Sequence, residues 1–422
     1  MKKLISWILL FVLLVLVSWL SITNLIFNEE EDLVNTQTFD KTSTEKTKLK
    51  LWFYYEGPER FNKVIKLIND FNQSNSKIEI TAEYIPFSQM RKQLIIAQVS
   101  GELPNLVIID NPYHAEFSEM GLFADITEQV NTIAGIDQFF EVPMNTVTYN
   151  EKIYGLPFAI NSIALFYNKE MLENANVPIP ETRDELRIAA KKLTNENTKG
   201  IGISALQNEE GVFQYLAWLY SAGGKPTDLD STEAIESFQF LSNLISDGSM
   251  SKEVINWTQA DLLKQFMEGN TAMMINGSWQ IPELKSLAPE LEYGVAFIPK
   301  DKVHATVLGG ENLAVINGEN IEESVEFIKY YAQTEVMESF VKEIGNYPPR
   351  KDVANDSTWT NDSIQKVFSE NMKYALPRGP SPEWSEISKV ISNALNKALT
   401  KEEEIEKITT EAQLKINKVL AK

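Results

Sequence analysis

The sequence predicts an α/β fold, because segments typical of strands alternate with segments typical of helices in its first globular part. Residues 48–56 form a strand-like run, and apolar residues recur at helical spacing through residues 59–75. Residues 78–84 alternate apolar and polar side chains as a half-buried strand does. A second helix over about 88–100 leads into the continuous apolar run 105–110, which is typical of a buried parallel strand.

Polar side chains follow two of these predicted strands. Tyr55 and Glu56 end the first strand, and Asp110, Asn111 and Tyr113 follow the third. Ligands of parallel α/β sheets meet the carboxyl ends of the strands. We therefore expect these five residues to contribute to a binding site.

Composition argues against several classes of function. The 422 residues are enough for more than one domain with a substantial core. The 59 acidic and 39 basic residues give a net charge of −20, which argues against nucleic acid or an anionic lipid surface as partner. The absence of cysteine excludes disulfides, thiolate metal sites and thiol nucleophiles.

The first 27 residues differ from the rest of the chain. Lys2 and Lys3 are followed by an uncharged run that ends at Phe27. The 23 residues from Ile5 to Phe27 would span about 34 Å as a helix, against roughly 30 Å of bilayer hydrocarbon. Bulky apolar residues near the end of the run argue against cleavage. We expect an uncleaved membrane anchor with the following residues outside the cell, and a cleaved signal sequence is the alternative.

Residues 28–48 are polar, rich in threonine and glutamate, and show no sustained periodicity. This composition predicts a disordered tether between the anchor and the globular part.

A series of phrases along the globular part resembles a known family. They are "LPNLVIIDNPYHAEFSEMGLFADIT", "KIYGLPFAINSIALFYNKEML", "EGNTAMMINGSWQIPEL", "EYGVAFIPK", "LGGENLAV", "GNYPPRKDV" and "PRGPSPEWSEI". In this order and at these intervals they resemble the extracellular solute-binding proteins of ABC transporters, in the branch that includes the maltose-binding protein. The resemblance covers about residues 49–420.

The resemblance implies two α/β lobes in a periplasmic-binding-protein-like fold, joined by several crossing segments. We expect crossings near residues 160–162, near Gly309 and Gly310, and near residues 346–350, where two prolines interrupt regular structure. The expected first lobe comprises residues 49–160 with 312–347, and the second comprises residues 163–308 with 350–422.

The resemblance also implies that a solute binds between the lobes, which close around it. Sugars need a flat apolar face and fixed polar groups, which aromatic and polar side chains supply. The aromatic candidates are Tyr113, Trp218, Trp279, Tyr347 and Trp384. The polar candidates are Asp110, Asn111, Asn161, Glu311 and Asn312, with Gly310 at the hinge and Arg378 for a charge-assisted contact.

Core packing is the competing interpretation for some candidates. Trp218 lies at helical spacing within an apolar segment, and Trp384 can lead the buried face of the helix that follows it. Glu311 can be solvated, although its position after two glycines favours the cleft.

Trp279 has a stronger case for the cleft. It follows a buried run that stops at Asn276-Gly277, and we expect a helix to start at Ser278 as its N-cap. This would place the indole at the carboxyl end of a strand, where it can face a solute.

Enzyme and iron-binding functions are the rivals. His114 and His304 belong to no zinc motif, and neither a nucleophile elbow nor a phosphate-binding loop occurs. A glycosidase needs only two carboxylates, so composition alone does not exclude one. Tyr330-Tyr331 resembles the tyrosine pair of iron-binding relatives, but it lies in a segment with the pattern of an amphipathic helix.

We therefore expect the extracytoplasmic carbohydrate-binding component of an ABC importer. It should be a monomer, with permease subunits as partners, no catalytic activity, no cofactor and no metal. The alternatives are a ligand-sensing protein for a membrane receptor or kinase, and a binder of a polyol, glycerol phosphate or ferric ion.

The first prediction concerns the anchor. N-terminal sequencing of the protein from native cells should find residues 1–27 retained, because the uncharged run is long, follows Lys2 and Lys3, and offers no cysteine for lipid attachment. A mature N-terminus near Asn24 would contradict the anchor and support a cleaved signal sequence.

Overall fold

The computed structural model describes residues 46–355 and 358–421. The anchor expected at residues 1–27 lies outside the described residues, as does most of the expected tether. Within the described ranges, no helix has both the length and the apolarity needed to cross a bilayer. The last residues of the expected tether belong to the globular part, because the first strand begins at Thr47.

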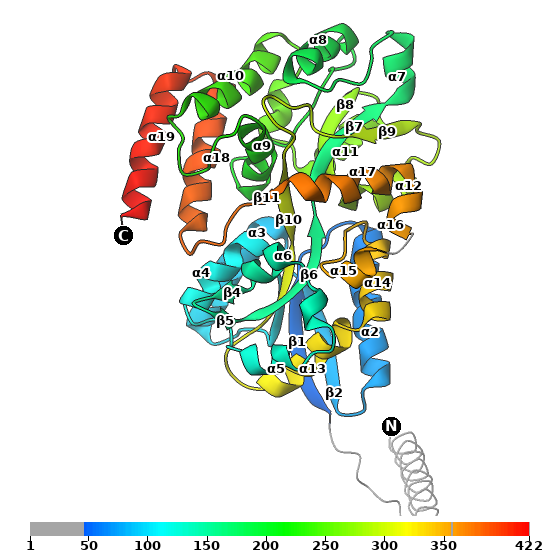
Figure 1. The fold of residues 1–422 in the computed structure, drawn as a ribbon, viewed down its shortest axis with the longest axis vertical. Coiled ribbons are helices and arrows are strands. Elements are labelled where there is room, and N and C mark those ends of the chain that lie inside the picture. The colour runs from blue at the N-terminus through cyan, green and yellow to red at the C-terminus, as the bar shows by residue number, and fades with distance from the viewer. Residues whose placement is uncertain (1–45, 356–357, 422) are drawn as a thin grey trace, which may run out of the picture. The chain divides into compact units, whose positions relative to one another are not determined.

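A mixed sheet forms the centre of the first lobe (Figure 1). Its order is β11-β10-β3-β1-β2, and β6 also pairs with β10. The bounds are β1 Thr47–Phe53, β2 Ile78–Tyr84, β3 Leu106–Asp110, β6 Gly155–Asn161, β10 Thr306–Val315 and β11 Ala375–Pro377. Parallel pairing of β1 with β2 and β3 confirms the α/β prediction, whereas β10 runs antiparallel to both β3 and β6.

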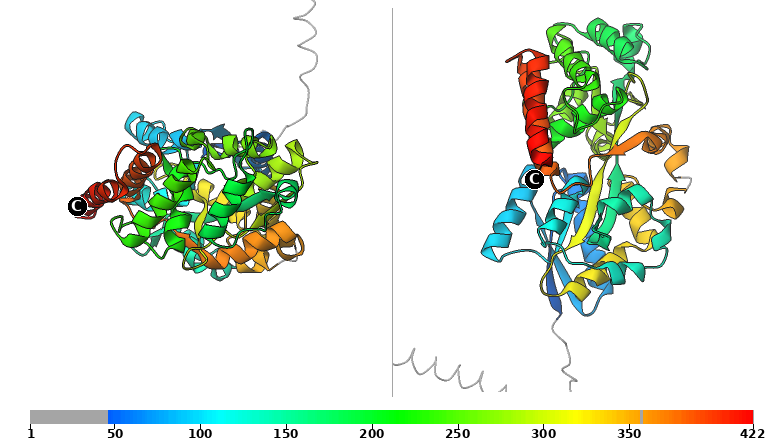
Figure 2. Two further views of the ribbon diagram at one scale, coloured as in Figure 1. Left: turned by 90° about the horizontal axis from the view of Figure 1, so that it is seen from above. Right: turned by 60° about the vertical axis from the view of Figure 1, so that its left-hand side comes forward.

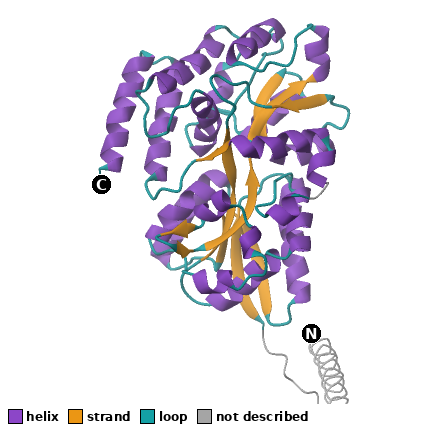
Figure 3. Ribbon diagram, in the orientation of Figure 1, coloured by secondary structure: helices purple, strands orange, loops and turns teal. Residues whose placement is uncertain are grey.

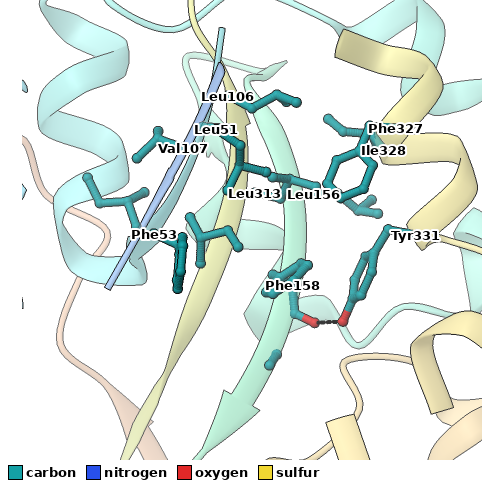
Figure 4. Close-up of a cluster of buried hydrophobic side chains, with 14 of the residues drawn as sticks. Leu51, Phe53, Leu106, Val107, Leu156, Phe158, Leu313, Phe327, Ile328 and Tyr331 are labelled. Carbon is teal, nitrogen blue, oxygen red and sulfur yellow. Dashed lines mark hydrogen bonds between the residues drawn. The ribbon is translucent and has the colours of Figure 1, made fainter. Parts of the chain in front are cut away.

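Helices cover this sheet on both sides, as Figure 3 shows. Their apolar faces and the buried strand residues form the first core, part of which is drawn in Figure 4. Tyr331 lies in this core and its hydroxyl donates a hydrogen bond to the Phe158 carbonyl, so one of the paired tyrosines packs inside the lobe. The elements are α2 Pro58–Ser74, α3 Phe87–Ser100, α4 His114–Glu119, α5 Thr127–Asn131, α6 Glu141–Thr146, β4 Thr148–Tyr149, β5 Lys152–Ile153, α13 Ile321–Tyr331, α14 Thr334–Glu343, α15 Lys351–Ala354 and α16 Thr358–Asn361.

The second lobe is built on a smaller antiparallel sheet in the order β8-β7-β9. Alternation along β7 divides its residues between two clusters: Ile163 and Leu165 enter the second core, and Ala164 and Phe166 enter a cluster on the other face. Figure 2 shows α18 and α19 packed along one flank of this lobe. The elements are β7 Ile163–Asn168, α7 Lys169–Asn174, α8 Arg183–Leu193, α9 Glu209–Ser221, α10 Thr232–Ser246, α11 Gln259–Met267, β8 Met273–Gly277, α12 Ile281–Leu287, β9 Tyr293–Ala296, α17 Ser363–Asn371, α18 Trp384–Thr400 and α19 Ile405–Leu420.

The chain passes between the two cores at several places. Strand β6 ends at Asn161 in the first sheet, and β7 begins at Ile163 in the second. In β10, Val307 packs in the second core and Leu308 in the first. The last passage lies further along than residues 346–350, because Trp359 still packs in the first core and α17 contacts the second-lobe sheet.

Gly310 occupies a position that only glycine fits without strain. Its φ is +129°, and a Cβ atom there would lie 2.2 Å from the Ala159 carbonyl oxygen of the paired strand β6. The register shifts immediately afterwards, between Glu311 and Asn312. This irregularity turns the side chains of β10 as the strand passes between the lobes.

The second prediction follows from this close approach. Gly310→Ala should lower the free energy of unfolding in urea by about 2–4 kcal/mol, from backbone strain plus the clash with Ala159. Gly223→Ala is the control, because Gly223 has φ +87° but a Cβ there meets no atom within 4 Å. The control should lose only about 1–2 kcal/mol. Equal losses in the two variants would show that packing against β6 does not matter.

Candidate functional site

A cavity of about 310 Å³ lies between the two lobes. The first lobe contributes Tyr54, Glu56, Gly57, Pro58, Arg60, Phe87 and Asp110, and the crossing strands contribute Asn161, Gly310 and Glu311. The second lobe contributes Glu209, Glu210, Phe213, Thr258, Gln259, Ala260, Leu263, Lys264, Met267, Trp279, Gln280, Glu283 and Leu287, and Arg378 completes the lining. Apolar and polar side chains thus surround the same space.

Arg378 connects the lobes at the cavity wall. It lies just after β11, and its Nη1 donates to Asp110 Oδ2 at 2.7 Å and to Glu209 Oε1 at 2.8 Å. Its Nη2 donates to Asp110 Oδ1 at 2.5 Å and to Asn111 Oδ1 at 3.2 Å. Asp110 ends β3 of the first lobe and Glu209 opens α9 of the second, so one guanidinium bridges both lobes.

Further donors hold Glu209 in place. The Trp384 indole N–H lies 3.2 Å from both carboxylate oxygens, and the Ser388 hydroxyl also donates to Glu209. The Arg378 guanidinium also stacks 4.6 Å from the centre of the Phe213 ring. Burial opposes its charge, but Asp110 and Glu209 more than compensate and hold the pKa of Arg378 above its ordinary value.

Trp279 reaches the cavity from a short turn after β8. Ser278–Gln280 form this turn, and no side chain caps it. The next helix, α12, begins only at Ile281 with Pro282 in its first turn, so the expected N-cap at Ser278 is wrong. A Cβ on Gly277 would lie 2.0 Å from the Trp279 ring, so glycine is required for the indole to fold back against the strand end.

Two glutamates in the cavity wall have raised pKa values. Burial raises the pKa of Glu311 to about 7, although the nearby Arg60 opposes the shift. Burial likewise raises the pKa of Glu210 to about 7, although the backbone N–H of Gln259 donates to its Oε2 at 3.0 Å. Glu311 also accepts a hydrogen bond from Asn346 Nδ2 at 3.1 Å.

The lobes also touch outside the cavity. Ser286 of α12 donates to Glu59 of α2 at 3.1 Å, on the right in Figure 1. Ser385 of α18 donates to Glu116 of α4, on the left in the same view. Glu116 in turn accepts from Arg91 Nε at 3.0 Å. These contacts and the Arg378 bridge join the two lobes.

Comparison with known proteins decides the family. The family model for bacterial extracellular solute-binding proteins matches residues 66–366. The chain belongs to this family. The match confirms the resemblance read from the sequence, and the family is one of extracellular binding proteins.

Individual relatives agree with this membership. A binding protein of Brucella abortus is 27% identical over 366 residues, covering 83% of this chain and 88% of its own length. The maltotriose-binding protein of Pyrococcus abyssi is 27% identical over 358 residues, covering 81% of this chain and 76% of that protein. An ABC transporter solute-binding protein of Thermotoga lettingae, solved with bound α-D-tagatose, is 28% identical with a TM-score of 0.83. That comparison covers 89% of this chain and 100% of the other, and it confirms the two-lobed fold.

Half of the residues expected at the site of this solute-binding protein line the cavity. They come from both lobes and from the crossing strands: Glu56, Asp110, Asn161, Trp279, Gly310, Glu311 and Arg378.

Four other expected site residues lie behind the lining on the first-lobe side. Tyr55 is buried in the first core with the Arg60 guanidinium 4.2 Å from its ring centre. Asn111 is buried and accepts from Arg378, whereas Asn312 is buried against Thr146. The Tyr347 hydroxyl lies 2.7 Å from Ser369 Oγ.

Three expected aromatic residues pack elsewhere. Trp218 is fully buried in the second core, because α9 is covered on almost every side. Trp384 is buried and supports Glu209 from behind. Tyr113 is half-buried and packs against both cores. Neither Trp218 nor Trp384 contributes to the lining; both stay in the core, as the competing interpretation has it.

Several residues that line the cavity were not predicted as site residues from the sequence. Glu209, Glu210 and Phe213 all lie in the first two turns of α9, whose start is marked by Asn208 as N-cap. The capping box from Thr258 to Asp261 marks the start of α11 in the same way. These helix-start signals can be recognised in the sequence. They do not show that the first turns of the two helices line the same cavity, because that depends on tertiary packing. Within the described ranges, no group of three or more metal-ligating side chains is placed to hold a metal ion.

The third prediction concerns Glu311. Its pKa rises from 4.5 to about 7 on folding, so between these values the folded state binds more protons and stability falls as pH rises. Glu311→Gln removes this loss and should raise the free energy of unfolding by up to about 3 kcal/mol at about pH 8. Urea unfolding at this pH and at about pH 4 measures the effect.

At the lower pH the variant and the parent should be nearly equal, because Glu311 is protonated in both states. The amide oxygen of glutamine can still accept from Asn346, so little else changes. Exposed Glu196→Gln is the control and should show no such pH-dependent gain. The same gain at both pH values would contradict the assigned cause.

Proposed function

We propose that this protein binds a carbohydrate in the interlobe cavity, as the substrate-binding component of an ABC importer. The observation that carries the proposal is the combination of an aromatic face and polar groups from both lobes around one space. Trp279 and Phe213 supply apolar surface for the C–H groups of a sugar ring. Asn161, Gln259 and Gln280 offer donors and acceptors for its hydroxyl groups.

Known relatives support the same class of ligand. The relative from Pyrococcus abyssi is named for maltotriose, and the structure from Thermotoga lettingae holds α-D-tagatose. At about 310 Å³ the cavity is near the lower end of the ~300–1,000 Å³ usual for small-molecule sites. We therefore favour a ligand of one or two sugar rings over a long oligosaccharide.

Binding would draw the two lobes together. A solute that contacts both walls of the cavity stabilises the closed arrangement and shifts the population toward it. The crossings between β6 and β7 and within β10 supply the hinge, with Gly310 at its most constrained point. A permease would then recognise the closed form.

The remaining parts of the proposal concern the setting of the protein. We propose a monomer outside the cytoplasm, held at the membrane by residues 1–27 and joined to them by a tether that ends before β1. Such an anchor would keep the binding protein close to its permease subunits.

The fourth prediction tests the proposal at Trp279. Titration calorimetry against a panel of neutral and amine-bearing saccharides should identify a ligand. Trp279→Ala should then raise its dissociation constant by roughly 5- to 150-fold, because about 1–3 kcal/mol of apolar contact with the sugar ring is lost. Trp279 is half-buried, so its loss should lower stability less than loss of a core tryptophan, which costs about 3–5 kcal/mol.

Trp257→Ala is the matched control. Trp257 is also half-buried and packs against the second core, but it does not line the cavity. Its variant should lose stability and keep near-normal affinity. The same result in Trp279→Ala would remove Trp279 from the site, and a panel in which no saccharide binds would contradict the proposed function.

A further inference from the structure

The cavity is lined by an excess of negative side chains. Six carboxylates and three cationic groups line it. The carboxylates are Glu56, Asp110, Glu209, Glu210, Glu283 and Glu311, and the cations are Arg60, Lys264 and Arg378. A cleft lined mainly by one sign of charge concentrates ligands of the opposite sign.

The three cations do not balance this excess. Arg378 is engaged by Asp110 and Glu209 in the interlobe bridge. Arg60 lies 4.2 Å from the centre of the Tyr55 ring and attracts Glu311 and Glu283, but it is not within ion-pair distance of either carboxylate. Lys264 pairs at 3.3 Å with Asp261, which is not part of the lining. Among the described residues, four cavity carboxylates have no Lys or Arg nitrogen within the 4.0 Å of an ion pair: Glu56, Glu210, Glu283 and Glu311.

Glu56 and Glu210 belong to opposite lobes. Glu56 follows β1 of the first lobe, and Glu210 lies in the first turn of α9 in the second. They interact across the cavity: burial raises the pKa of Glu210 to about 7, and the charge of Glu56 adds to the increase. A cation between the two carboxylates would replace this repulsion with two attractions.

Glu283 provides a second, independent sign of a missing donor. Its side chain lines the cavity, the residue is only 7% exposed, and its Oε1 accepts no hydrogen bond from any described residue. A buried carboxylate oxygen without a donor costs free energy, and in a binding cavity a ligand can supply that donor.

We propose that the saccharide taken by this cavity carries a positively charged amine, which binds between Glu56 of the first lobe and Glu210 of the second. The inference rests on the proposed function and names the class of sugar. An ammonium group has three donors and no acceptor, so it can donate to one carboxylate of each lobe at the same time. Sugars that carry phosphate or carboxylate groups are disfavoured by the same charges.

Such a ligand would couple recognition to closure. With the cavity empty, Glu56 and Glu210 oppose the approach of the lobes, and an ammonium group removes that opposition. A neutral sugar of the same shape leaves the repulsion in place. The amine thus contributes to affinity mainly in the closed arrangement.

The experiment compares amino sugars with counterparts that lack the positive charge. Glucosamine and its di- and trisaccharides are titrated at about pH 7 against their N-acetylated counterparts, which lack the positive charge. We expect at least one amine-bearing member to bind about tenfold or more tightly than its acetylated partner. Glu56→Gln and Glu210→Gln should each abolish most of this preference, and exposed Glu290→Gln should preserve it.

Thermal unfolding first establishes that all three variants fold. Equal or tighter binding of the acetylated series overturns the inference and leaves the proposed function standing. Failure of both series to bind, when other members of the saccharide panel do bind, also overturns it. A preference that survives both cavity substitutions places the amine elsewhere and overturns the assignment to Glu56 and Glu210.

Discussion

A single buried guanidinium group links the two lobes at the wall of the cavity. Arg378 donates to Asp110 at the end of a first-lobe strand and to Glu209 at the start of a second-lobe helix. Buried ion pairs add little net stability, but loss of one partner costs about 3–5 kcal/mol because a buried charge is left alone. The main effect of Arg378 is therefore to hold the two lobes in a defined relative position. Trp384 donates to Glu209 and so holds one of the two carboxylates that Arg378 binds.

Local patterns in the sequence were sufficient to predict the three parallel strands β1, β2 and β3 of the central sheet. The run that forms β3 is buried at all five positions, and such a run is recognisable without knowledge of its neighbours. The antiparallel partner β10 is different, because its pairing with β3 and β6 joins segments far apart in the chain. The two-lobed arrangement came from the family resemblance, and the last passage between lobes lies beyond Trp359 because that side chain packs in the first core.

The candidate site was only partly predictable for the same reason. Glu56 and Asp110 lie at the carboxyl ends of the parallel strands β1 and β3, so the rule that ligands meet these ends places them near the cavity. Trp279 follows β8 of the antiparallel second-lobe sheet. In α9 the spacing of apolar residues does not show which face of the helix points to the cavity, because almost all of its residues are buried. Phe213 consequently faces the cavity while Trp218 fills the core, and only tertiary packing distinguishes them.

The central place of β10 also constrains how the protein can fold. This strand pairs with β3, β6 and β11, yet it begins only at Thr306, after most of the second lobe. Until β10 pairs with them, β3 and β6 have unpaired edges that are open to pairing with other chains. Pairing between such distant segments slows folding, because a long loop must close first. The sheet of the first lobe therefore cannot be completed until β10 has formed, although most of the second lobe precedes β10 in the chain.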